Sequence, residues 1–183
     1  TRTVMLDSSS LYSNIFPYAG MDIREKIITF TKPAEKIVVL DNAALDTIYS
    51  NGEWHRVVAT HDFASYPPQA SEIPKVSDAF NMNLEAIIEL DPDLVFVFYE
   101  TFVSDLEDAG LKVLYLESLG NDLEETTELI TMWGRITGNI HRAEKESLLF
   151  DERVSTIQGM LSNTDSELKV FQDVGDLWTP GQN

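Results

Sequence analysis

Short apolar runs alternate with amphipathic segments along most of the chain. Four runs rich in Val, Ile, Leu and Phe predict buried strands at 36–40, 56–60, 94–98 and 112–116. Four segments with helical spacing, each followed by an Asn, Gly or Asp-Pro stop, predict helices at 43–50, 83–90, 103–109 and 122–137. Strands that alternate with helices through short connections are typical of an α/β domain with right-handed crossovers.

The run at 94–98 is the most apolar of the four and leaves no polar face. Both of its faces must therefore be covered, which favours an open parallel sheet flanked by helices. Residues 1–30 form a polar lead-in, in which only Ile27–Phe30 predicts a short edge strand.

A different pattern begins at Ile140. Residues 140–163 hold no Pro and predict one unbroken helix of about 36 Å. We expect its apolar stripe to pack against the sheet through Phe150, Val154 and Ile157. A further strand is predicted at 168–172, and a single strand cannot bury its own apolar surface. The predicted organisation is an N-terminal lobe at 1–139, a connecting helix at 140–163 and the start of a C-terminal α/β lobe at 164–183.

Charge and composition narrow the function classes. The chain has 13 Lys and Arg against 31 Asp and Glu, a formal net charge of -18, which repels nucleic acid and anionic membrane surfaces. It has no cysteine, so disulfides, thiolate metal sites and cysteine nucleophiles are excluded. No apolar run is long enough for a membrane helix, and the chain begins Thr-Arg-Thr without an export signal. Either the protein is cytoplasmic or a signal segment is absent from this chain.

Motifs of the common α/β enzymes are missing. There is no Gly-x-Gly-x-x-Gly after the first strand, no phosphate-binding loop and no Gly-x-Ser-x-Gly elbow. The three histidines, His55, His61 and His141, do not have the spacing of a zinc hydrolase. An enzyme would have to use Asp41, His61 or Glu100, which is a minor alternative.

Ligands of open α/β sheets bind beyond the carboxyl ends of the strands. The loops expected at that edge carry these candidate ligand-binding residues: Asp41, Asn42, His61, Asp62, Phe63, Tyr66, Phe80, Asn81, Tyr99 and Glu100. They are aromatic and acidic and contain no Lys or Arg, which suits a large, flat, partly apolar ligand. In the alternative interpretation, the aromatic side chains only pin long loops to the domain.

Several segments together resemble the class III substrate-binding proteins of ABC importers. They are Ala-Glu-Lys-Ile-Val-Val-Leu at 34–40, Ser-Tyr-Pro-Pro-Gln-Ala at 65–70, Pro-Lys-Val at 74–76, Asn-Leu-Glu-Ala-Ile at 83–87, Leu-Asp-Pro-Asp-Leu-Val at 90–95, and the tail from Val170 to Gly181. The resemblance covers about residues 32–181. It implies two α/β lobes joined by a long helix, with ligand between them and no chemistry performed. It also adds Trp178, at the start of the second lobe, to the ligand-binding residues.

The resemblance also implies partners and a location. A monomer without an intrinsic cofactor would deliver an iron or cobalt chelate to an ABC permease and ATPase. Glu85, the glutamate of the Asn-Leu-Glu segment, would dock on permease arginines. Members of this family are periplasmic, or are tethered by lipid outside the membrane.

The ligand itself stays open among corrinoid, iron siderophore and haem. Phe63, four residues before the Pro-Pro pair, matches the cobalamin-binding members, whereas Ala79 stands where they have an aromatic and Phe80 is adjacent. An acidic half-cleft disfavours anionic siderophores. A haem-binding protein would need an axial ligand such as His61, Tyr66 or Tyr99. For His61 the alternative is a solvent-exposed loop residue.

Overall fold

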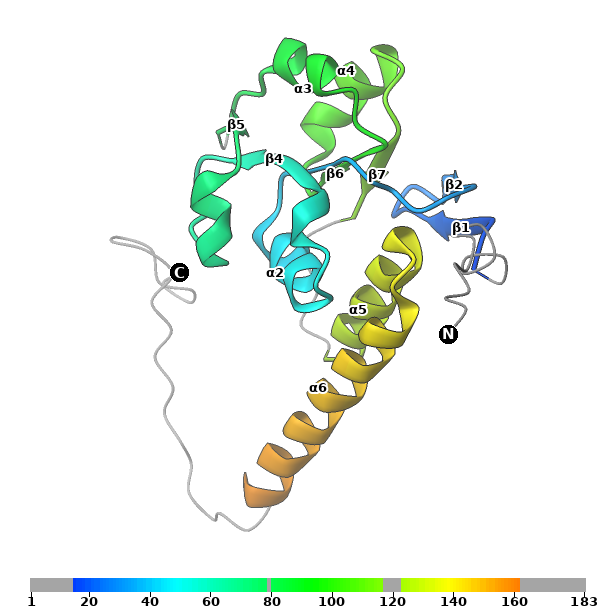
Figure 1. Ribbon diagram of the computed structural model, residues 1–183, viewed down its shortest axis with the longest axis vertical. Coiled ribbons are helices and arrows are strands. Elements are labelled where there is room, and N and C mark those ends of the chain that lie inside the picture. Colours follow the sequence, from blue (N-terminus) through cyan, green and yellow to red (C-terminus); the bar gives the residue numbers. More distant parts are fainter. Residues whose placement is uncertain (1–14, 79, 117–122, 162–183) are drawn as a thin grey trace, which may run out of the picture. The chain divides into compact units, whose positions relative to one another are not determined.

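A five-stranded parallel sheet forms the centre of the fold (Figure 1). The computed structural model describes residues 15–78, 80–116 and 123–161. The strand order is β5-β4-β3-β6-β7, and every neighbouring pair is parallel. The strands are β3 Ile37–Val39, β4 Val57–His61, β5 Lys75–Ser77, β6 Leu94–Val97 and β7 Val113–Tyr115. The predicted α/β class with an open parallel sheet is confirmed. Strand β5 was not predicted, because three residues after Pro74 carry no periodic signal.

The helices lie where the sequence predicts them. They are α2 Asn42–Ser50, α3 Leu84–Leu90, α4 Val103–Asp108, α5 Leu123–Thr137 and α6 Ile140–Leu161, with 3₁₀ turns η1 Trp54–Arg56, η2 Pro68–Glu72 and η3 Glu100–Phe102. Side chains just before two helices set their starts. The Asp41 carboxylate accepts the Ala44 N–H at 2.7 Å, and the Asn83 side-chain oxygen accepts the Ala86 N–H at 3.0 Å. Both bonds satisfy backbone donors that a helix leaves unpaired in its first turn.

Alternate residues of each strand feed two separate cores, one on each face of the sheet. Ile37 and Leu94 pack in the core that also contains side chains of α2 and α5. Val38 and Val95, one position further along, pack in the second core with side chains of α3 and α4. Figure 1 shows these two helix pairs on opposite sides of the sheet. The sheet is therefore buried on both faces, as a run with no polar face requires.

The predicted edge strand at 27–30 exists, but its partner is not the main sheet. Strands β1 (Tyr18–Met21) and β2 (Ile27–Phe30) form an antiparallel hairpin. Ile28 and Phe30 are buried in the core on the α5 side. The hairpin is also attached to the sheet, since the Ile23 N–H donates to the Tyr115 carbonyl at 3.1 Å.

Helix α6 is continuous from Ile140 to Leu161, while residues 162 and 163 lie outside the described part. Its packing differs from the prediction: Phe150 and Val154 are only half-buried, and the Ile157 side chain is 56% exposed. Ala143 is the buried residue of this helix. The prediction that Ile157 packs against the sheet was therefore wrong, because a 3.6-residue period shows that one face is apolar, not what covers it.

By its contacts the chain divides into two units, residues 1–151 and 152–183. The sheet, its helices and the first half of α6 belong to the first unit. The domain boundaries predicted at 139 and 163 stay predictions. The strand expected at 168–172, and Trp178 with it, lie outside the described residues.

Candidate ligand-binding site

The sheet brings the predicted loops to one edge. Because all five strands are parallel, their carboxyl ends meet there, and the order β5-β4-β3-β6 places four of the loops side by side. After β3 the chain adds β4 and β5 on one side, then returns to place β6 on the other. The direction of winding therefore reverses between β3 and β6, with Asp41 and Tyr99 just beyond the two strand ends. Ligands of open α/β sheets bind at such a switch point.

Four aromatic side chains are exposed along these loops. The exposed fractions are 64% for Phe63, 58% for Tyr66, 86% for Phe80 and 47% for Tyr99. Tyr66 makes an edge contact with Tyr49 of α2, with ring centroids 6.4 Å apart. Phe63, Tyr66 and Phe80 keep more than half of their surface in solvent, and Tyr99 keeps almost half, so burial against the domain accounts for only part of each side chain. Exposed apolar patches on a protein surface are typical of interaction sites.

His61 is the last residue of β4 and directly precedes the loop that carries Phe63 and Tyr66. Its side chain is buried, with 8% exposed, and its Nε2 has no hydrogen-bond partner. The alternative of a solvent-exposed loop residue is therefore wrong for His61: it closes a strand inside the sheet. An axial haem ligand presents an open nitrogen to the iron, which a buried Nε2 does not.

Asp41 is the acidic group with the largest charge effect on His61, and the pKa values of the two groups shift in opposite directions. Burial lowers the pKa of His61, although the charges of Asp41 and Asp62 act against this shift. Burial also raises the pKa of Asp41, while its hydrogen bond from the Ala44 N–H lowers it. The Asp41 carboxylate thus serves first as the cap of α2.

The chemistry of the rim is acidic and aromatic, as predicted. Asp62 and Glu100 are exposed, and Asn42 and Asn81 add exposed amides. Within the described ranges, no three His, Asp or Glu side chains are grouped to hold a metal ion.

Lys75, at the start of β5, was missed in the sequence. Its Nζ donates to the carbonyls of Ala64 at 3.0 Å and Ala70 at 2.8 Å, so it fastens the loop that carries Phe63 and Tyr66. Burial lowers the pKa of Lys75, with the charge of Asp62 opposing the shift. No signal in the sequence pattern points to these bonds, because both acceptors are backbone atoms.

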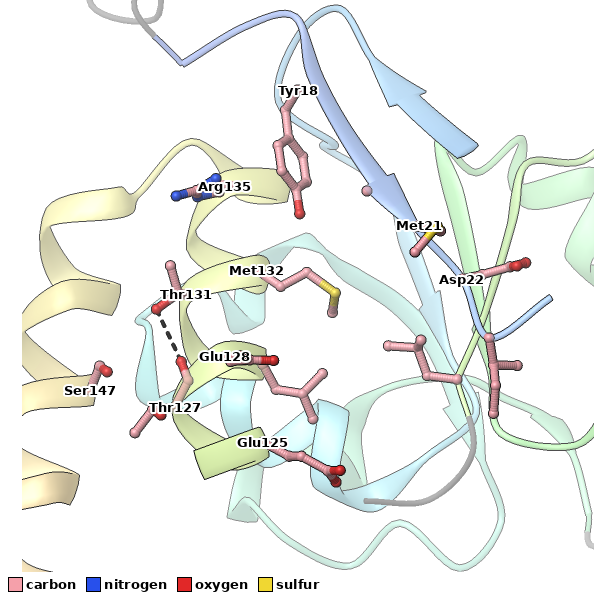
Figure 2. A pocket seen from close by; sticks show the side chains of 14 residues that line it. Tyr18, Met21, Asp22, Glu125, Thr127, Glu128, Thr131, Met132, Arg135 and Ser147 are labelled. Atoms are coloured by element: carbon pink, nitrogen blue, oxygen red, sulfur yellow. Dashed lines mark hydrogen bonds between the residues drawn. The ribbon is translucent and has the colours of Figure 1, made fainter. Parts of the chain in front are cut away.

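A pocket of about 890 Å³ lies elsewhere in the same unit. Figure 2 shows Tyr18 of β1 and Met132 of α5 projecting into it, with Arg135 and Ser147 also on its wall. Burial raises the pKa of Tyr18, and the nearby Arg135 charge opposes the shift. Of the predicted ligand-binding residues that the structure describes, none lines this pocket, so it is separate from the aromatic edge.

Glu85, the predicted docking residue, lies in the first turn of α3 and is exposed. The Asn83 cap precedes it by two residues. The structure therefore presents Glu85 outward at a helix N-terminus, where a carboxylate is also stabilised by the helix dipole.

Residues 37–175 match the family described as periplasmic binding protein. The chain belongs to that family. The match begins at β3 and includes every loop of the aromatic edge. The chain is 31% identical to a cobalamin-binding protein of Halobacterium salinarum. The aligned part makes up 92% of this chain and 47% of that protein. In the described residues, no helix has both the length and the apolarity that a membrane crossing requires.

Solved structures show the same fold. The periplasmic vitamin B12 binding protein of Vibrio cholerae superposes with a TM-score of 0.64 at 25% identity, over 72% of this chain and 52% of that one. An iron uptake ABC transporter substrate-binding protein of Streptococcus pneumoniae superposes with a TM-score of 0.71 at 21% identity, over 80% and 54%. The chain thus spans about half the length of the proteins it matches.

Proposed function

We propose that this chain is the ligand-capturing N-terminal half of the substrate-binding component of an ABC importer for metal chelates. The single observation that carries the proposal is the exposed aromatic edge at the switch point of the sheet, in a chain of the periplasmic binding protein family. Such a surface is suited to binding a chelate, and nothing in it is arranged for turnover. The protein binds and releases its ligand without chemical change.

A corrinoid is the first candidate among the chelates. The exposed rings of Phe63, Tyr66 and Phe80 offer apolar contact to a large flat ligand, and the carboxylates of Asp62 and Glu100 favour a neutral or cationic one over an anionic one. The relatives named as cobalamin-binding and vitamin B12-binding support the same choice. Asp41, Asn42, Asn81 and Tyr99 complete the proposed contact set on this half.

Haem is the second candidate, supported by the exposure of Tyr66 and Tyr99, whose hydroxyls can reach an iron. The structural neighbours include periplasmic haem-binding proteins, which share the fold. An iron-coordinated Tyr would give a charge-transfer absorption band, whereas a corrinoid bound by ring contacts would keep its own spectrum nearly unchanged. Absorption spectra therefore separate the two ligands.

The other half of the cleft would come from a second α/β lobe, entered through the strand at 168–172 and contributing Trp178. A ligand site normally covers most of its ligand, and one edge of one sheet does not. We further propose that the protein works outside the membrane, free or tethered by lipid, as a monomer that docks on a permease and ATPase through Glu85.

The test is a titration of two proteins, the 183-residue chain and a natural protein extended by the proposed second lobe. Cyanocobalamin, haemin and a ferric hydroxamate would each be titrated by calorimetry, with absorption spectra recorded alongside. The proposal predicts that the extended protein binds one of the three, and that the 183-residue chain binds the same ligand far more weakly. Equal affinity for both proteins would refute the two-lobed cleft. No binding of any of the three by the extended protein would refute the function.

A further inference from the structure

The loop between β5 and α3 holds one aromatic side chain almost entirely in solvent. Phe80 is 86% exposed, more than any other large apolar side chain in the described part of the chain. Hydrophobic burial does not hold this ring in place, because the ring has almost no buried surface. Whatever defines its position must act on the backbone beside it.

Asp78 holds the backbone beside Phe80 through hydrogen bonds. Its Oδ1 accepts the backbone N–H of Phe80 at 2.7 Å and that of Asn81 at 2.6 Å. The Asn81 side-chain amide donates to the same carboxylate, 3.3 Å from Oδ1 and 3.1 Å from Oδ2. A carboxylate that accepts several N–H bonds at once is a strong local constraint on the chain, because bonds to an ionised acceptor are stronger than neutral ones. The Phe80 N–H, followed by the bonds from Asn81, lowers the pKa of Asp78.

Backbone bonds close the same turn from both sides. The Asp78 N–H donates to the Asn81 carbonyl at 2.9 Å, and the hydroxyl of the buried Ser77 donates toward the carbonyls of Asp78 at 2.8 Å and Asn81 at 3.1 Å. The Ser77 carbonyl in turn accepts the Asp62 N–H at 2.8 Å. The turn is therefore connected directly to the residue that precedes Phe63. The two aromatic loops form one hydrogen-bonded unit at the edge of the sheet.

We propose that Asp78 is a positioning residue for ligand binding, because its carboxylate holds the turn that presents Phe80 as a preformed contact. This role rests on the function proposed above. Binding a ligand with a loose loop requires the loop to become ordered, which weakens affinity. A turn already closed by Asp78 removes that requirement. Asp78 itself does not need to touch the ligand.

A double-mutant cycle tests the role in the extended protein, with cyanocobalamin as the probe. Asp78→Ala removes the acceptor and is expected to weaken binding about three- to tenfold, the size of an ordering penalty for one side chain and its loop. Asp78→Asn keeps an acceptor oxygen in the same place and should stay within about twofold of the wild type. Phe80→Ala should weaken binding at least as much as Asp78→Ala, and Asp78→Ala added to it should have no further effect. Asp108→Ala, which removes an exposed charge at the end of α4, is the matched control and should bind as the wild type does.

A second measurement does not depend on whether Asp78→Ala folds. In the ligand-free wild type, the amides of Phe80 and Asn81 should exchange hydrogen more slowly than those of an unstructured peptide. Exchange at the unstructured rate would overturn the proposal, because the turn would then not exist before the ligand arrives.

The outcomes of the cycle are distinct. If Asp78→Ala binds as tightly as the wild type, or weakens binding equally in the Phe80→Ala background, Asp78 does not act through Phe80 and the proposal is wrong. If Phe80→Ala has no effect while the wild type binds, the proposal is also wrong, but the proposed function stands. If the wild type binds none of cyanocobalamin, haemin and a ferric hydroxamate, the proposed function fails and the role of Asp78 fails with it.

Discussion

The contact between α5 and α6 depends on a glycine. A Cβ added to Gly134 would lie 2.2 Å from the Cβ of Ala143, 3.3 Å from the Asn139 carbonyl oxygen and 3.5 Å from the Cα of Ile140. Carbon atoms in contact are normally about 3.5–4.0 Å apart, so Gly134→Ala would force the two helices apart by more than about 1 Å. Two of these three neighbours are backbone atoms, which cannot rotate away.

The expected loss of stability follows from two opposing effects. Overpacking costs about 1–3 kcal/mol, and the rigid backbone neighbours favour the upper half of that range. Replacing a glycine inside a helix returns about 0.5–1 kcal/mol. We therefore expect Gly134→Ala to lower the free energy of unfolding by about 1–2 kcal/mol.

A matched control lies in α6, where a Cβ at Gly159 would meet no atom within 4 Å. Gly159→Ala should raise the stability by up to about 1 kcal/mol. Urea unfolding followed by circular dichroism would measure both variants on the 183-residue chain. Ala143→Gly added to Gly134→Ala should recover part of the loss, because it removes the opposing methyl group. If Gly134→Ala were as stable as Gly159→Ala, the close approach of the two helices would be refuted.

Three further predictions concern polar groups. Glu53→Ala removes the buried carboxylate that pairs with the buried Arg56 guanidinium, which keeps only the exposed Glu35 as an ionic partner, beside its bond to the Ala34 carbonyl. The substitution should cost about 3 kcal/mol in urea unfolding. A change below about 1 kcal/mol would show that the pair is dispensable. Burial lowers the pKa of His61, so below about pH 6.5 the unfolded state binds more protons than the folded state does. The wild type should therefore lose stability more steeply than His61→Gln as the pH falls from about 7.5 to 5.5. The raised pKa of Asp41 has the opposite effect on stability, but mainly at lower pH, where carboxylates titrate. If the stabilities of the wild type and His61→Gln fall equally between about pH 7.5 and 5.5, the lowered pKa assigned to His61 is contradicted. Glu85→Ala in the extended protein should leave ligand affinity unchanged, shift stability by no more than about 1 kcal/mol and weaken transporter-stimulated ATP hydrolysis or uptake. Lost ligand binding would place Glu85 in the cleft instead. No change in any assay would show that Glu85 has no docking role and only stabilises the start of its helix.

Local patterns were enough to predict most of the secondary structure. The apolar run at 94–98 predicted a strand covered on both faces, and Leu94–Val97 is buried at every position. The helices predicted at 43–50 and 83–90 both form, and the side chains of Asp41 and Asn83 cap them. These signals succeed because hydrogen bonds and side-chain periods within a few residues are properties of the local chain. The alternation of strands and helices indicated a parallel sheet, and a parallel sheet places the carboxyl ends of its strands, with the loops that follow them, at one edge.

Only the tertiary structure decided how groups distant in the sequence meet. The burial of His61, the attachment of the Phe63 loop by Lys75 and the partial exposure of the α6 stripe all depend on what packs against each residue. The pairing of β1 with β2 and the short strand β5 were likewise invisible in the sequence. A lysine that binds backbone carbonyls leaves no trace in a hydrophobic pattern, because every residue has a carbonyl. The sequence thus determines which segments form elements and which edge they create, whereas the long-range contacts determine which side chains at that edge are free to meet a ligand.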